Sequence, residues 1–119
     1  MGQITARVLT AKPGPVVTAE NDPNHLLGRP GQYTSAALFT DDRVQADQRN
    51  PDPTSLDNGG KVEAFATADD AQKRRDYVEQ IAKATPLAVE YDYVAGAALV
   101  RVSKAVTPAQ AVQYQAALN

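Results

Sequence analysis

Residues 20–34, "ENDPNHLLGRPGQYT", concentrate the side chains best suited to acid–base chemistry and include the only histidine of the chain, His25. Histidine often acts as a general base because its pKa lies near neutrality. Together with Asp22 and Tyr33, His25 could line a pocket for a small ligand or for an enzymatic reaction. The alternative is a turn that is capped by Asp22 or Asn24, anchored by Leu26 and Leu27, and ended by Gly28. We favour the capped turn and expect no catalytic residue, since no serine follows the GxSxG pattern of hydrolases.

A second candidate site is the polar segment 41–60, "DDRVQADQRNPDPTSLDNGG", in which aspartates recur. Asp47, Asp52 and Asp57 could supply oxygens to Ca²⁺, which takes about six to eight oxygen ligands, or they could contact a partner. An EF-hand does not fit, because Ser55 stands where the loop requires glycine. We therefore expect a mobile, solvated loop with no metal site and no cofactor.

Two tyrosines on one predicted strand form the third candidate site. Tyr91 and Tyr93 are two residues apart and therefore lie on the same face of a strand. If helices cover the opposite face, which carries Val100 and Val102, the tyrosine pair is exposed. Exposed tyrosines provide a large contact area at low entropic cost, which suits recognition of a partner. The alternative is that both rings pack into the core.

The composition excludes several classes of protein. A chain of 119 residues is long enough for one domain. Its 12 Lys and Arg residues stand against 14 Asp and Glu residues, so we expect no nucleic-acid partner. The absence of cysteine excludes disulfides, thiol catalysis and Cys-ligated zinc within the chain. No apolar run approaches the roughly 20 residues of a membrane-spanning helix.

The first predicted helix begins after Thr67, a candidate N-cap residue, and ends before Pro86. Its helical periodicity predicts a buried stripe. Arg74 falls among the charged residues that we place outside this stripe. The residues of the stripe are Ala71, Tyr77, Val78, Ile81 and Ala82.

The fold class follows from the order of the predicted elements. Alternation of apolar and polar residues predicts four strands, and Thr107 followed by proline predicts a final helix. The order ββαββα with short connections predicts an α+β fold, in which a single antiparallel sheet of about four strands has its helices packed on one face. The strands are predicted at residues 33–41 and 61–67 and as a hairpin over residues 88–103, for which one long bent strand is the alternative.

Residues 1–17 are predicted to form a lead-in, either flexible or a short helix, that precedes a single domain over residues 18–119. The segment "KPGP" at 12–15 opposes regular structure, because proline lacks an N–H group and restricts the residue before it.

Several phrases of the sequence together resemble a group of small secreted proteins and lipoproteins of actinobacteria that form a domain of unknown function. These phrases are "ENDPNHLLGRPGQYTS", "GGKVEAFATADDAQKRRDYV", "EYDYVAGAALVRVS" and "VTPAQAVQY". The resemblance spans roughly residues 18–118 and implies an extracellular or cell-envelope location. It carries over no catalytic or ligand-binding residue. The chain departs from the group because no signal peptide or lipid-attachment cysteine is present in it, which leaves a cytoplasmic or phage-encoded relative as the alternative.

From these features we expect a non-catalytic, extracytoplasmic binding domain whose partner is a protein or a component of the cell envelope. The alternatives are a small secreted inhibitor of another protein, and a ligand-binding or enzymatic domain that uses His25. The oligomeric state is not set by the sequence.

Overall fold

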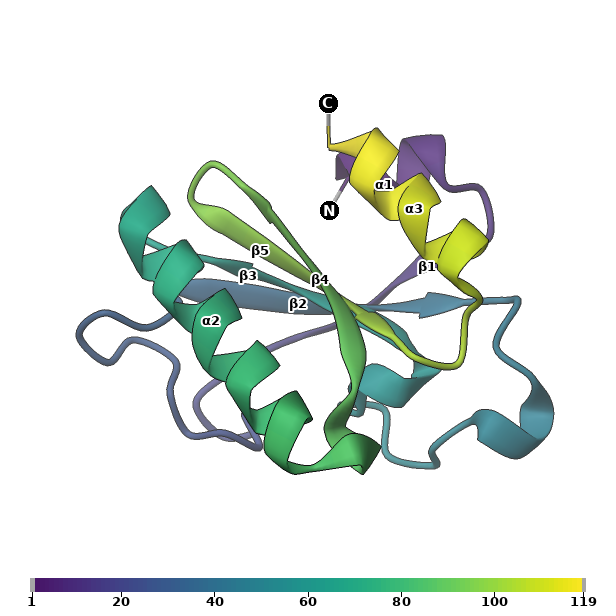
Figure 1. Ribbon diagram of the computed structural model, residues 1–119, viewed down its shortest axis with the longest axis horizontal. Coiled ribbons are helices and arrows are strands. Elements are labelled where there is room, and N and C mark those ends of the chain that lie inside the picture. The colour runs from purple at the N-terminus through teal and green to yellow at the C-terminus, as the bar shows by residue number, and fades with distance from the viewer. Residues whose placement is uncertain (1, 119) are drawn as a thin grey trace.

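The computed structural model describes residues 2–118 and confirms an α+β fold built on one antiparallel sheet (Figure 1). The sheet has five strands in the order β1-β2-β3-β5-β4, so β1 and β4 form its two edges. The strands are β1 (Ala11–Val16), β2 (Ser35–Asp41), β3 (Gly59–Ala64), β4 (Glu90–Ala95) and β5 (Ala98–Ser103), and the helices are α1 (Gly2–Arg7), α2 (Ala68–Ala84) and α3 (Pro108–Ala117).

The fifth strand, β1, lies in the segment for which no regular structure was expected, and that expectation was wrong. Pro13 and Pro15 are tolerated because β1 is an edge strand, which pairs with β2 on one side only. The register shifts between Pro13 and Val16, and this irregularity absorbs the second proline. The lead-in is therefore part of the domain: α1 and β1 both contribute buried side chains to its core.

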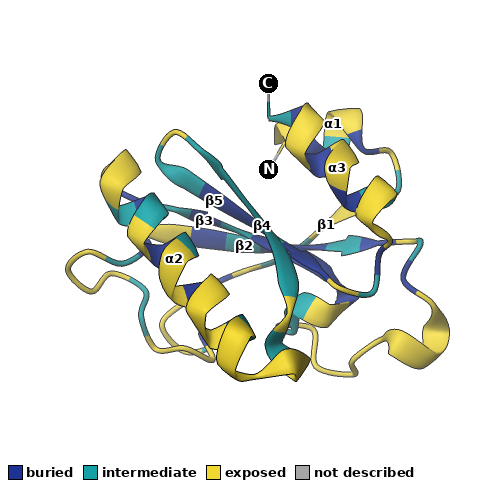
Figure 2. Cartoon of the chain, in the orientation of Figure 1, coloured by how far each residue is buried: buried dark blue, intermediate teal, exposed yellow. Residues whose placement is uncertain are grey.

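The helices lie on both faces of the sheet, which corrects the prediction that they share one face (Figure 2). Val100 and Val102 point from β5 toward α1 and α3, whereas Leu99 and Arg101 point toward α2. Central strands with apolar side chains on both faces need cover on both faces. The sheet thus separates two cores, of which the one beneath α1 and α3 is the larger.

Both predicted N-caps are confirmed. The Thr67 hydroxyl accepts a hydrogen bond from the amide of Asp70, and Thr107 forms a complete capping box with Gln110. The buried stripe of α2 differs from the prediction: Arg74 is buried, while Tyr77 and Ile81 are 55% and 39% exposed. Among residues 2–118 no helix is both long and apolar enough to cross a membrane.

The polar connection between β2 and β3 has an internal framework, centred on the buried side chain of Asn58. Its amide oxygen accepts from the amide of Asn50 at 2.8 Å, and its amide nitrogen donates to the carbonyls of Asn50 and Asp52. Two 3₁₀ turns, η1 (Ala46–Gln48) and η2 (Leu56–Asn58), complete the segment. One buried amide therefore fixes a loop that composition alone describes as solvated.

Gly60 gives the clearest test of how the sheet packs. A Cβ atom built on Gly60 would clash with the carbonyl oxygen of Arg101 and with the ring of Phe39. We expect Gly60→Ala to lower the free energy of unfolding by about 1–3 kcal/mol or more, because neither neighbour can move without disturbing the core. Urea denaturation measures the loss. Gly2→Ala, where a Cβ atom would meet nothing within 4 Å, is the control; equal stability of the two variants would contradict this packing.

Candidate functional site

Asp22 and Tyr33 do meet, but they form a closed structural unit. The Tyr33 hydroxyl contacts the two Asp22 oxygens at 2.9 and 2.8 Å, and the same carboxylate accepts from the amides of Asn24, Leu26 and Leu27. Burial raises the pKa of Asp22, but these hydrogen bonds outweigh burial and lower it to about 2. Burial, aided by the Asp22 carboxylate, raises the pKa of Tyr33 to about 12.

His25 takes no part in this pair. Its backbone has a φ of 54°, and its side chain is exposed beside a small cavity of about 110 Å³. Because every contact of the Asp22 carboxylate goes to Tyr33 or to backbone amides among the described residues, Asp22 is not oriented to activate an imidazole. The arrangement corresponds to the capped turn.

Tyr91 and Tyr93 do not form an open recognition face. Tyr91 pairs with Val102 and Tyr93 with Val100 across β4 and β5, so the rings share the face of those valines. Both rings are half-buried against the core beneath α1 and α3, and the Tyr91 hydroxyl donates to the carbonyl of Val106. The placement on an exposed face was wrong, and the rings pack against the core as in the alternative, because the register of the hairpin puts them on the face of Val100 and Val102, which α1 and α3 cover.

The aspartates of the polar loop do not converge on a common point. Asp52 accepts from Thr54 within a local turn, and those hydrogen bonds lower its pKa, while Asp47 and Asp57 are exposed in separate 3₁₀ turns. Among residues 2–118 no group of three or more His, Cys, Asp or Glu side chains could hold a metal ion.

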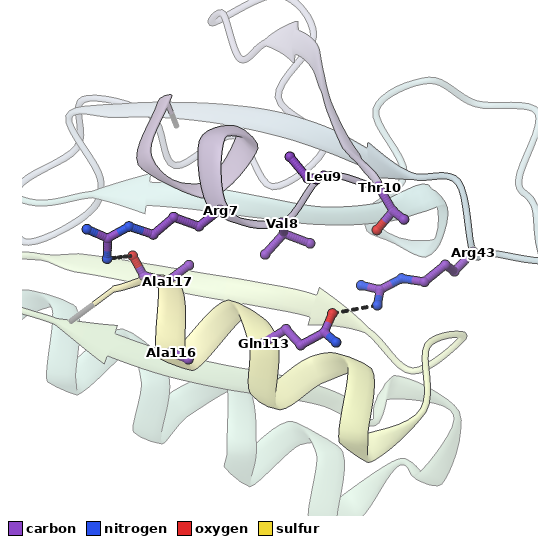
Figure 3. Close-up of a pocket in the computed structure, with 8 residues that line it drawn as sticks. All are labelled: Arg7, Val8, Leu9, Thr10, Arg43, Gln113, Ala116 and Ala117. Carbon is purple, nitrogen blue, oxygen red and sulfur yellow. Dashed lines mark hydrogen bonds between the residues drawn. The ribbon is translucent and has the colours of Figure 1, made fainter.

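A cavity of about 580 Å³ lies between the end of α1 and α3 (Figure 3). Its two guanidinium groups form hydrogen bonds within the chain. Arg7 donates to the carbonyl of Ala117. Arg43 donates to the side chain of Gln113 and to both carboxylate oxygens of Asp41. These bonds join the N-terminal helix, β2 and the C-terminal helix. The cavity therefore lies where these elements meet, and its charged groups already donate hydrogen bonds to acceptors within the chain.

A buried ionic cluster on the opposite face of the sheet is the strongest candidate site. Glu63 of β3 is fully buried and contacts three cations. Its Oε1 lies 3.2 Å from Nε of Arg74, and its Oε2 lies 3.1 Å from Nη1 of Arg101 and 3.3 Å from Nζ of Lys61. These side chains come from three different elements, so the cluster ties α2 to the two central strands.

Glu90 and Asp92 of β4 extend this cluster toward the edge of the sheet. Arg101 holds Glu90 in a two-point contact, from Nε at 2.7 Å and from Nη2 at 2.8 Å. Burial raises the pKa of Glu90, but Arg101 outweighs it and lowers the pKa. Burial and the neighbouring Glu90 carboxylate raise the pKa of Asp92 well above its usual range. Asp92 is therefore neutral at pH 7, which leaves three cations facing two carboxylates.

Two cavities open on this cluster and share Asn24 and Arg101 in their walls. One, of about 310 Å³, lies beneath the polar loop and is lined by Lys61. The other, of about 280 Å³, lies beside α2 and is lined by Arg74. Burial lowers the pKa of Lys61 against the opposing effect of Glu63.

The cavity beside α2, which we call the Arg74 cavity, combines charge with apolar walls. Among residues 2–118, Arg74 makes one hydrogen bond, from Nε, which leaves its two terminal nitrogens available at the cavity. The guanidinium lies 5.8 Å from the ring centres of both Tyr33 and Tyr77. Such a site can hold an apolar group against its walls and a carboxylate against Arg74. The apolar wall residues are Leu26, Tyr77, Val78, Ile81 and Ala88.

The ionic cluster was not identified from the sequence. Arg74 was assigned to the solvated face of its helix, because it follows Lys73 and precedes Arg75 and Asp76. One signal was present: Lys61 and Glu63 occupy alternate positions of a predicted strand, so both face the same way. Charges repeated on one face of a central strand must be either solvated or paired, and the positions of β5 and α2 decide between these outcomes.

Compared with known protein families, curated proteins and solved structures, the chain shows no match.

Removing the central carboxylate tests the cluster. We expect Glu63→Gln to lower the free energy of unfolding by about 3–5 kcal/mol, because three cations lose their common partner in a buried environment. Chemical denaturation at pH 7 measures the change. Glu79→Gln is the control, since its ion pair with Arg75 is exposed and should contribute less than about 0.5 kcal/mol. A loss at Glu63 no larger than that of the control would contradict the central role of this carboxylate.

Carboxyl groups whose pKa is lowered in the folded state predict that the protein loses stability in acid. Arg43 and Tyr114 outweigh burial at Asp41 and lower its pKa from 3.8 to about 2. Since the folded-state pKa is lower than the unfolded one, the stabilisation is complete above about pH 4 and is lost as pH falls toward about 2. The free energy of unfolding falls as pH drops from about 4 to about 2, and we expect Asp41→Asn to make this fall smaller by about 2 kcal/mol.

Urea titrations at a series of acidic pH values measure the dependence of stability on pH. Asp47→Asn, which changes an exposed carboxylate of the polar loop, is the matched control. If Asp41→Asn and the wild-type chain lose stability in parallel as pH falls, the lowered pKa of Asp41 does not stabilise the fold.

Proposed function

We propose that this chain is a non-catalytic binding domain and that it contacts a partner protein at the Arg74 cavity. The observation that carries the proposal is a guanidinium with two available nitrogens beneath an exposed apolar rim. Tyr77 and Ile81 form part of this rim, while Leu87 and Val89 flank Ala88 and are 83% and 48% exposed. Aromatic and arginine side chains surrounded by apolar contacts dominate the binding energy of protein interfaces.

The charge of the cluster supports a partner with an acidic group. With Asp92 neutral, three cations are opposed by two carboxylates. A carboxylate of the partner at Arg74 would balance the third cation in a partly desolvated site, where ion pairs are stronger than at an open surface. We therefore propose a partner segment that places an apolar side chain on Tyr77 and Ile81 and an acidic side chain next to it.

We also propose that this binding takes place outside the membrane, at the cell envelope. The support for this location is the resemblance to small secreted proteins and lipoproteins of actinobacteria. Accessibility of the chain to an antibody on intact cells tests it, with a cytoplasmic protein of the same cells as the control. Detection only after the cells are lysed would contradict the proposed location.

Site-specific photocrosslinking in the cells that produce the protein tests the binding site. A benzophenone side chain in place of Tyr77 should capture a discrete partner, whereas the same group in place of Val112 should not. Val112 is a matched control position for Tyr77, because the two residues are 52% and 55% exposed and lie on different helices. Ile81→Asp should reduce the capture from position 77 at least tenfold, because it places a negative charge next to the acidic group of the partner.

Ile81 is partly exposed on a helix surface, so Ile81→Asp should leave the thermal unfolding midpoint nearly unchanged. Equal capture from positions 77 and 112, or capture that Ile81→Asp does not alter, would contradict the assignment of the Arg74 cavity as the binding site.

A further inference from the structure

The two edges of the sheet differ in how they are protected. β1 carries Pro13 and Pro15, and proline at an edge prevents another strand from pairing there. β4, "EYDYVA", contains no proline and no lysine, and its residues pair in unbroken register with β5. Unprotected regular edges are the places where proteins accept an additional strand.

The register of the hairpin shows which backbone groups of β4 face outward. Ala95 pairs with Ala98 across a two-residue turn, and in such hairpins the pair next to the turn is hydrogen-bonded. Hydrogen-bonded pairs then alternate along the strand, so the backbone N–H and C=O groups of Tyr91 and Tyr93 form hydrogen bonds with β5. The N–H and C=O groups of Glu90, Asp92 and Val94 point away from the sheet. Within residues 2–118 no other segment forms a backbone hydrogen bond to them.

A groove of about 530 Å³ runs beside this edge. Its floor is formed by residues 92–96 of the hairpin, and its sides come from α2 and α3, between which β4 lies in Figure 1. Gln72 and Arg75 line the α2 side, and Gln115 and Leu118 line the α3 side. An edge strand flanked by helices matches the shape in which an extended peptide adds to a sheet.

One unpaired oxygen atom in the groove selects among extended peptides. Oδ1 of Asp92 is buried and, within residues 2–118, receives no hydrogen bond from an N–H or O–H donor of another residue. Arg75, which lines the α2 side of the groove, is already paired with Asp76 at 3.3 Å and with Glu79 at 3.9 Å. A Lys or Arg side chain that enters on this side would donate a hydrogen bond to the unpaired Oδ1 of Asp92.

We propose that the β4 edge binds an extended segment of a partner protein that adds as a sixth strand and directs a Lys or Arg side chain toward Asp92. Alternate residues of the segment face α3, where Tyr93 and Leu118 favour apolar side chains. This site lies apart from the Arg74 cavity, and the proposal does not depend on the function proposed above.

A second copy of the chain fits the edge less well than a basic segment. In antiparallel pairing of two β4 strands centred on Asp92, Asp92 of one copy lies opposite Asp92 of the other, about 4.8 Å away, so neither copy brings a basic side chain to the unpaired oxygen. The partner is therefore expected to be a different chain with a basic residue at this position.

Selection of a random peptide library of about ten residues per peptide, long enough to span β4, tests the proposal. We expect enrichment of peptides with Lys or Arg at one position and apolar residues at its two neighbours. NMR-detected hydrogen exchange of the complex with a selected peptide should show new protection at the amides of Glu90, Asp92 and Val94. The amides of Tyr91 and Tyr93 should be protected with and without peptide.

Three variants separate the edge from other surfaces. Val94→Pro removes one outward N–H without removing a bond to β5 and should weaken the selected peptides at least tenfold. Asp92→Asn should abolish the preference for a basic residue. Gln115→Trp should block the groove, whereas Val112→Trp, on an exposed position of the same helix that does not line it, should not. Thermal unfolding midpoints confirm that each variant folds.

Three outcomes would overturn the proposal: no peptide enriched above background, exchange protection outside β4, or binding unaffected by both Val94→Pro and Gln115→Trp. Self-association of the chain with protection of the same three amides would assign the edge to a second copy and overturn the proposed partner.

Discussion

Glu63 is the group on which the arrangement of this domain depends. Its carboxylate is fully buried and contacts a lysine of its own strand, an arginine of the neighbouring strand and an arginine of α2. A buried charge is tolerated only where partners surround it. The position and direction of α2 over the sheet are therefore tied to the side chain of Arg74, and apolar packing on this face is left to a smaller core.

The two faces of the sheet consequently have different roles. The face beneath α1 and α3 is closed by aromatic and aliphatic packing, with Phe39 stacked on Tyr114 at a centroid distance of 5.1 Å. Its polar groups, Asp41 and Arg43, bind the hydroxyl of Tyr114 and the side chain of Gln113. The face beneath α2 holds cations, carboxylates and two cavities. The apolar face supplies packing stability, while the other face retains the charged groups at which we propose that a partner binds.

The edges of the sheet show a similar division. Pro13 and Pro15 prevent a further strand from pairing with β1, while the outward amides and carbonyls of β4 lie between two helices. Both proposed sites flank α2: the Arg74 cavity lies on its apolar side, and the β4 groove lies beside Gln72 and Arg75. α2 is thus the element whose placement determines both surfaces, and Glu63 determines that placement.

The sequence by itself determined the local features of this protein. Periodicity and turn chemistry predict the N-caps at Thr67 and Thr107, the turn after Ala95, the strand alternation and a capped turn at Asp22 or Asn24, because these features depend on neighbouring residues. Tertiary structure alone decided which faces are covered, that Arg74 is buried and that Pro13 and Pro15 lie in a strand. Each of these depends on contacts between segments distant in the chain. A charged helix residue is solvated or paired according to what lies opposite it, and Glu63 is eleven residues away from Arg74 in sequence and 3.2 Å from it in space.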